Sequence, residues 1–296
     1  MDTLDDHPQF AWQPLTPRGV AAFAGAPLAR LLTVQVVVAL LAAGAVVWFL
    51  HRAWFPVVTQ AIKRLPEQGE LRGGRLDWRG DSPEILAESR FLALAVDLNH
   101  SGQARSPAHV QLEFGQRNLQ IFSLLGFVPW TYPRDCAVAC NRPTLEPWWG
   151  AWAPPLLGLT AAAVMAALLL VWALLATVYC WVGWVLGLSA NREATLRGSW
   201  RLAGAALMPG ALFLTGAIVL YGLGTLDLIQ LMAAGGLHLV IGWVYLLLSP
   251  WWLPWQADLT GAKGNPCQNS HGQSPTPIDR EQASEVQRPR EDRSMS

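Results

Sequence analysis

The polar residues that could carry chemistry lie in one apolar stretch near the end of the chain. Asp227, Gln230, His238 and Tyr245 fall within ~80° of one another when they are placed on a helix. His238 would lie ~16 Å along that helix from Asp227, near the middle of a membrane. Ionisable groups at that depth often mark a proton or ion path. The alternative, which we favour, is that neutral His238 and Gln230 bond to neighbouring helices while Asp227 lies at the water interface.

A second candidate is a pair of cysteines with three residues between them, Cys136 and Cys140. They precede an apolar segment in a region that we expect to be extracytoplasmic and oxidising. Such a compartment favours a disulfide, and two unpaired thiols are the alternative. A metal site is disfavoured, because zinc takes four ligands and no histidine lies nearby in the sequence. We therefore expect no metal and no cofactor.

The sequence contains no phosphate-binding glycine loop, zinc motif or nucleophile elbow. The apolar segments offer serine and threonine but no partner carboxylate or lysine, so they lack the converging groups that catalysis requires. Asp97 and Glu113 are carboxylates on predicted strands outside these segments, and we interpret both as exposed strand residues. We accordingly expect no catalytic residue.

The composition is typical of a membrane protein. Charged residues make up 14% of the 296 residues, whereas an ordinary soluble domain carries roughly 25%. The chain has 16 Trp but only 4 Tyr and 9 Phe, and tryptophan collects at the two bilayer–water interfaces. The formal net charge is zero, which argues against nucleic acid as a partner. Nearly all basic residues are arginine, as in GC-rich bacterial coding.

Four uncharged segments are long enough to cross a bilayer core of ~30 Å. The second is too long for one perpendicular span, so we predict a single tilted helix after an interfacial stretch at residues 147–155. Two half-helices within residues 147–191 are the alternative. Pro209 should kink the third segment, since it removes a backbone donor. The predicted transmembrane helices are residues 31–52, 155–188, 202–222 and 228–250.

Basic residues in the short loops predict the orientation. The loop at residues 189–201 holds three arginines against one glutamate, which places it in the cytoplasm. The N-terminal segment, residues 1–30, and the C-terminal tail, residues 256–296, then lie in the cytoplasm too. The tail lacks aromatic residues and is rich in polar and charged residues, so we predict that it is disordered. We expect this topology in the bacterial inner membrane.

Residues 53–154 are predicted to form a small extracytoplasmic domain made mainly of antiparallel strands. Gly73 and Gly74 suit the centre of a two-residue hairpin, because both tolerate positive φ. The apolar run at residues 91–96 predicts a buried strand. Alternating apolar and polar residues at 110–114 predict a half-buried strand.

This layout of one span, an outer domain and three further spans is accompanied by several short motifs: Leu65-Pro66, Gly69-Glu-Leu-Arg-Gly-Gly-Arg-Leu, Pro83-Glu-Ile, Leu94-Ala-Val-Asp-Leu, Arg197 and Ser199-Trp200. Together they resemble an uncharacterised family of bacterial membrane proteins, some of which are labelled maltodextrin-utilisation-like. The layout is similar over residues 30–250. Asp97 matches an aspartate of that family, but Leu98 stands where the family pattern has a hydroxyl residue. The resemblance implies no catalytic residue.

These patterns lead to a functional hypothesis of a non-enzymatic accessory or binding protein whose outer domain binds a ligand or a partner. Its expected partners are the lipid bilayer and either other membrane proteins or a second copy of the chain. A small transporter or permease component that uses the polar stripe from Asp227 to Tyr245 is the first alternative. A membrane-anchored enzyme acting at the outer surface is the second.

Overall fold

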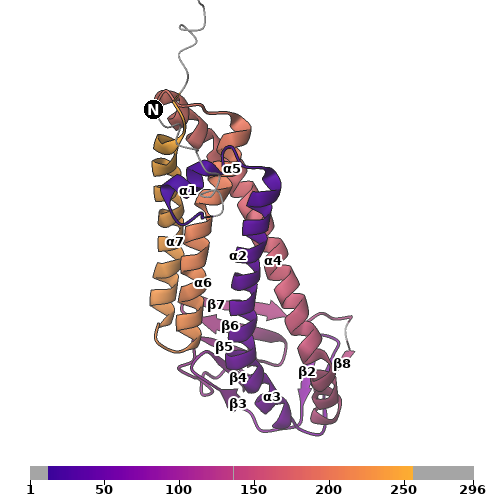
Figure 1. Cartoon of the computed structure of the whole chain (residues 1–296). Helices are drawn as coiled ribbons and strands as arrows, with labels where there is room; N and C mark the ends of the chain where they lie inside the picture. The colour runs from indigo at the N-terminus through magenta and orange to yellow at the C-terminus, as the bar shows by residue number, and fades with distance from the viewer. Residues whose placement is uncertain (1–12, 136, 256–296) are drawn as a thin grey trace, which may run out of the picture. The chain divides into compact units, whose positions relative to one another are not determined.

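The computed structural model describes residues 13–135 and 137–255. It contains a small β-sheet region and four helical segments long and apolar enough to cross a membrane, so the coarse fold class is confirmed (Figure 1). The described residues up to Pro254 belong to one unit, and Trp255 alone is described from a second unit. The predicted disordered tail lies outside the described residues. The four segments are Leu28–Lys63, Arg142–Ser189, Leu196–Gly222 and Leu228–Trp252.

The first of these segments is longer than predicted and reaches into the β-region. After the short helix α1 (Pro17–Ala22), helix α2 (Leu28–Phe49) continues through the π-helical turn η2 (Leu50–Trp54) into α3 (Phe55–Lys63). The π turn ends two residues before Pro56, which lacks a backbone N–H and interrupts the regular hydrogen bonding. The helical path thus passes residue 52 and brings α3 to the sheet.

Helix α4 (Arg142–Ser189) is a single helix of 48 residues rather than two half-helices. The stretch at residues 147–155 is part of its helical beginning, although it contains Pro147, Pro154 and Pro155. A helix of this length extends ~70 Å, more than twice a bilayer core of ~30 Å. Its first turns lie beside α3.

The third segment is divided into α5 (Leu196–Ala206) and α6 (Met208–Gly222), which meet at Leu207 just before Pro209. Helix α5 begins inside the predicted loop at 189–201, because the hydroxyl of Thr195 accepts a hydrogen bond from the Gly198 N–H at 3.0 Å. The fourth segment consists of α7 (Leu228–Leu248) and the 3-10 turn η3 (Ser249–Trp252).

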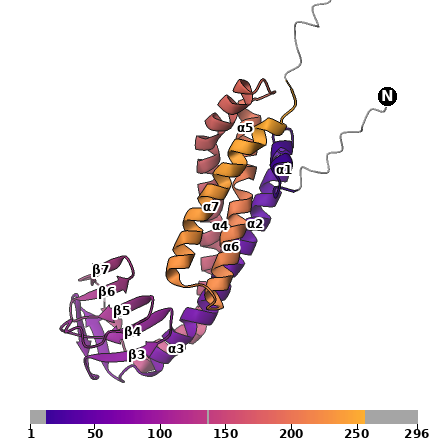
Figure 2. The same ribbon diagram turned by 90° about the vertical axis from the view of Figure 1, so that its left-hand side faces the viewer.

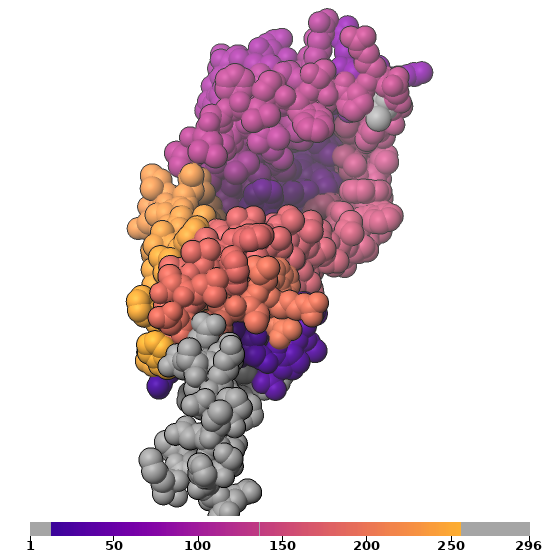
Figure 3. All heavy atoms as spheres, turned by 90° about the horizontal axis from the view of Figure 1, so that it is seen from above, coloured from indigo at the N-terminus to yellow at the C-terminus, as the bar shows by residue number. Residues whose placement is uncertain are grey.

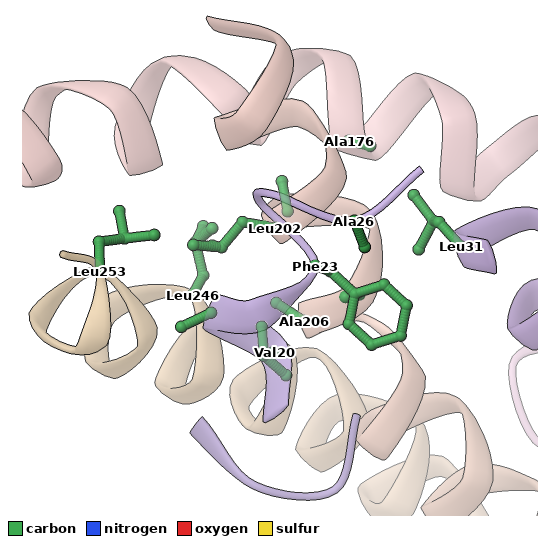
Figure 4. Packing of buried hydrophobic residues seen from close by; sticks show 12 residues of the cluster. Val20, Phe23, Ala26, Leu31, Ala176, Leu202, Ala206, Leu246 and Leu253 are labelled. Atoms are coloured by element: carbon green, nitrogen blue, oxygen red, sulfur yellow. The ribbon is translucent and has the colours of Figure 1, made fainter. Parts of the chain in front are cut away.

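The helices pack closely around small residues. A Cβ added to Gly210 on α6 would collide with the carbonyl oxygen of His238 on α7, so this contact requires glycine. At the end of the helices away from the β-region, α1 contributes to a core shared by α2, α4, α5 and α7 (Figure 4). The labelled side chains there are Val20, Phe23, Ala26, Leu31, Ala176, Leu202, Ala206, Leu246 and Leu253.

The β-region, here called the β-domain, has two sheets whose strands are mainly antiparallel, as predicted, with one parallel pair. That pair is β4 with β5; all other neighbours are antiparallel. The expected hairpin at Gly73 and Gly74 is present, with φ of +57° and +73°. The small sheet has the order β2 (Arg75–Trp78), β1 (Gly69–Arg72), β8 (Ala137–Ala139). The large sheet has the order β3 (Glu84–Glu88), β4 (Leu92–Val96), β5 (Val110–Phe114), β6 (Asn118–Ser123), β7 (Gly126–Thr131).

Helix α3 covers one face of the large sheet at β3 and β4 (Figure 2). Leu92, Leu94 and Val96 of β4 form a core there with Val57 and Ala61 of α3. The same chain segment that enters as a candidate membrane helix therefore ends as the helical layer of the β-domain. This continuity links the two parts of the molecule mechanically.

Candidate functional site

The opposite face of the large sheet is also covered, and it is polar. Gln111 and Glu113 of β5 point to this face, because their neighbours on the strand pack toward α3. Glu113 is 0% exposed and Asp97 is 1% exposed, so the prediction of exposed strand carboxylates is wrong. The physical reason is the parallel pairing of β4 and β5, which requires a crossover between them. Residues 97–109 form that crossover and shield the polar face.

Glu113 is the centre of a buried hydrogen-bond network. Its Oε1 lies 2.6 Å from Nδ1 of His100, and its Oε2 accepts a hydrogen bond from Nε2 of Gln111 at 3.3 Å. Nε2 of His100 lies 2.8 Å from Oδ1 of Asn118. Burial lowers the pKa of His100, but its bonds to Glu113 and Asn118 and the nearby negative charges outweigh burial and raise it. Both ring nitrogens of His100 face side-chain oxygens, an arrangement that suits the imidazolium form.

Asp97 organises the tight turn at the start of the crossover. Its Oδ2 accepts hydrogen bonds from the Ser101 hydroxyl at 2.8 Å and the Gly102 N–H at 3.0 Å, and Oδ1 accepts one from the Asn99 N–H. Burial raises the pKa of Asp97, but these bonds outweigh it and lower the pKa overall. Ser101 donates to Asp97 and not to His100, so the serine and histidine do not form a nucleophile–base pair here. The network holds a loop in place.

The β-domain is joined to the α6–α7 turn by two polar contacts. The guanidinium of Arg90 donates to the carbonyl oxygens of Gly224 at 2.8 Å and Leu226 at 3.1 Å. The hydroxyl of Tyr221 lies 2.6 Å from Nδ1 of His109. A planar guanidinium can bridge two carbonyls at once, which fixes orientation as well as distance.

Aromatic rings pack around these contacts. The ring of Phe91 lies 5.0 Å from Tyr221 and 5.3 Å from Phe49, and His109 stacks on Tyr221 at 5.6 Å. Burial lowers the pKa of His109, the charge of Arg90 lowers it further, and Asp227 opposes them without reversing the shift. The lowered pKa of His109 favours its neutral form, which packs against Tyr221.

Beside this junction lies a cavity of about 540 Å³, which we call the outer cavity. Arg105, His109 and Gln111 contribute polar groups from the β-domain, and Asp227 does so from the start of α7. The guanidinium of Arg105 lies 3.7 Å from the ring centre of Phe122, within range of a cation–π interaction. The lining combines both signs of charge with apolar surface. Such mixed lining suits a ligand or peptide with polar and apolar parts.

The polar residues predicted on α7 share that helix, but they do not form one site. Asp227 and Gln230 form a reciprocal capping box, with bonds of 2.7 and 2.9 Å between each side chain and the other's N–H. His238 bonds through Nδ1 to the carbonyl of Gly235 in its own helix. The Tyr245 hydroxyl donates to the carbonyl of Leu15 at 2.6 Å. The bonds expected from Gln230 and His238 to neighbouring helices are instead bonds within α7.

A second cavity, of about 860 Å³, lies at the other end of the helices. Arg18, Arg30, Glu193 and Trp252 line it, and the guanidinium of Arg18 lies 4.4 Å from the Trp252 ring centre. The sequence carries no recognisable motif for either cavity. Each is assembled from segments far apart in the chain, so local spacing could not reveal it.

Cys140 follows β8, whereas Cys136 lies outside the described residues, so the predicted disulfide stays a prediction. Within residues 13–135 and 137–255, no three His, Cys, Asp or Glu side chains gather in a way that could hold a metal ion. Comparison of the chain with protein-family models, with curated proteins and with solved structures found no match.

Proposed function

We propose that the protein is an accessory or binding protein of the bacterial inner membrane, with four transmembrane helices and the β-domain on the outer side. Both chain ends would lie in the cytoplasm. Arg192 in the turn between α4 and α5, Arg197 and Arg201 in α5, and the lack of basic residues at the turn between α6 and α7 support this orientation. The exposed surface of α4 and α7 is rich in large apolar side chains, as a lipid-facing surface would be.

The outer cavity is the observation that carries the binding role. It lies where the β-domain meets the start of α7, and its walls supply Arg105 and Asp227 as opposite charges and Phe122 as an aromatic surface. Gln111 links this cavity to the buried network, because the same side chain donates to Glu113. A cavity wall held by a satisfied polar network is pre-organised, which reduces the cost of binding.

The test fills the outer cavity in the full-length protein. Ala108 lines the cavity, so Ala108→Phe should block it, whereas Ala137→Phe on exposed β8 is the matched control. After detergent extraction from cells, the wild type and the control should recover the same partner or bound small molecule, and Ala108→Phe should lose it. Quantitative mass spectrometry of proteins and extracted small molecules measures the loss.

Equal recovery by all three proteins would contradict a binding role for the outer cavity. Substrate-dependent flux in liposomes containing the purified protein, abolished by His238→Ala in a folded variant, would favour the transporter alternative instead. His238→Ala with unchanged flux would exclude a proton path through that residue.

A further inference from the structure

The hairpin formed by β6 and β7 carries a continuous apolar surface that the rest of the described chain leaves uncovered. Residues 118–133 contain no charged residue. Every residue of β7 is exposed, including Trp130 at 62%, and Leu125 in the turn is 83% exposed. The other large exposed apolar residues of the hairpin are Leu124, Phe127 and Val128.

Such a surface requires a partner. Strand β7 is the edge of the large sheet, and exposed apolar edge strands in water invite association with other chains. Natural edges are usually protected by charges, but this one has none. Large exposed apolar patches on soluble surfaces mark interaction sites. The absence of charge on the hairpin indicates that its partner is itself apolar.

The position of the hairpin identifies that partner. The outer cavity is bordered by Phe122 and Leu124 of the hairpin on one side and by Leu228 and Ile229 of α7 on the other. In both side views β7 lies level with the turns of α6 and α7 nearest the β-domain (Figures 1 and 2). Seen from above, the β-domain protrudes to one side of these helices (Figure 3). The hairpin is thus beside the ends of the helices, not beyond them.

We propose that the β6–β7 hairpin inserts into the outer leaflet of the bilayer that the helices cross, with Trp130 at the lipid–water boundary. This inference rests on the proposed transmembrane placement of the helices. Ile229 on the first turn of α7 is 65% exposed and would contact lipid at the same depth, so the apolar surface is continuous with that of the helices. Tryptophan is favoured at this boundary because its ring is amphipathic. The outer cavity would then open at the edge of the lipid phase.

Photo-crosslinking in the full-length protein tests this placement. A benzophenone amino acid replaces Leu125, and the protein is reconstituted in phosphatidylethanolamine–phosphatidylglycerol vesicles whose acyl chains carry an alkyne tag. Arg79, an exposed residue elsewhere in the β-domain, is the control outside lipid, and Val178, 63% exposed on α4, is the control within lipid. Position 125 should form at least about fivefold more lipid adduct than position 79, because the probe reacts only with groups in contact.

The outcomes separate the two proposals. Adduct at position 178 but not at 125 overturns the hairpin inference and leaves the membrane placement intact. No adduct at 178 overturns both. A crosslinked dimer at 125 in place of lipid adduct identifies a second copy as the partner, and a crosslink to another protein in native membranes identifies a protein partner; either result overturns lipid insertion. The probe at Phe127 repeats the measurement on β7, so a local defect at 125 cannot decide the result.

Discussion

Two sets of polar residues in this protein find their hydrogen-bond partners in different ways. On α7, Asp227 and Gln230 cap the helix start and His238 bonds one turn back, so each side chain is paired close to its own position. Around Glu113, the network draws on the crossover and on strands β5 and β6, and His100 links Glu113 to Asn118. The hydrogen bonds on α7 are local, and its capping residues Asp227 and Gln230 are exposed. The hydrogen bonds around Glu113 are buried and join several segments.

The difference follows from backbone hydrogen bonding. A helix satisfies its own backbone, so a polar side chain on it finds acceptors in the preceding turn or at a free helix end. A strand leaves no free backbone group beside its side chains, so the buried carboxylate of Glu113 is met by Gln111 of its own strand and by His100 from another segment. Loss of one residue should therefore have a small local effect on α7 and a large cooperative effect around Glu113.

The largest expected effect comes from Glu113→Ala. Removal of the buried carboxylate leaves Nδ1 of His100 without its partner, removes one of the two acceptors of Gln111, and should destabilise the β-domain by about 3 kcal/mol. Hydrogen exchange of the full-length protein in detergent should show faster exchange across residues 97–109. Glu67→Ala at an exposed position is the control and should change little. Equal exchange in both variants would show that the Glu113 network does not hold the crossover.

Arg90→Leu should have the next largest effect. Loss of two charge-assisted hydrogen bonds to the α6–α7 turn should cost about 1–2 kcal/mol, less than a buried pair because the site is exposed. We expect faster exchange at residues 222–227 and unchanged exchange in the β4–β5 pair. Arg79→Leu, which removes only an exposed ion pair with Asp77, is the matched control.

Asp227→Ala tests the locally hydrogen-bonded residues of α7. Loss of the helix cap should cost about 1 kcal/mol and increase exchange only in the first turn of α7. Asp227→Asn should retain most of the protection, because an amide oxygen can also accept the cap hydrogen bond. Effects that spread to His238 or Tyr245 would contradict the view that these residues are independent.

The smallest expected effect is a pH dependence from His100. Its pKa in the folded protein is raised, so its stabilisation is complete below the unfolded value of about 6.5 and declines as pH rises through the folded value. Exchange at residues 97–109, corrected for intrinsic rates, should therefore be slower at pH 6 than at pH 8, and His100→Gln should remove the difference. His109 should contribute a pH dependence of the opposite sign. Because its pKa in the folded protein is lowered, the contact with Tyr221 should weaken as the pH falls.

Much of the fold was predictable because its signals are local. Runs of uncharged residues located the four helical segments, the paired glycines located a hairpin, and Pro209 marked the interruption next to Leu207. The helix ends were less predictable. The helical path continues past residue 52 as α3, because α3 has an apolar face that packs on the sheet, and sequence alone does not show that partner.

The candidate site was not predictable in the same way. The alternation at β5 is typical of a half-exposed strand, and Gln111 and Glu113 would be solvated if no segment crossed above them. The decisive feature is the parallel pairing of β4 with β5, which is a long-range choice. Arg90 and His109 likewise gain their roles only because the α6–α7 turn lies against them.

Apolar segments, their lengths and the positions of turns can be read from the sequence, because they depend on residues close together in the chain. The burial of Asp97 and Glu113, the cavity between the β-domain and α7, and the exposure of the apolar hairpin beside the helices emerge only in the folded chain. Those properties depend on contacts between segments that are distant in sequence. The free energy of a polar or apolar side chain there depends on its burial and its contact partners, and not on its residue type alone.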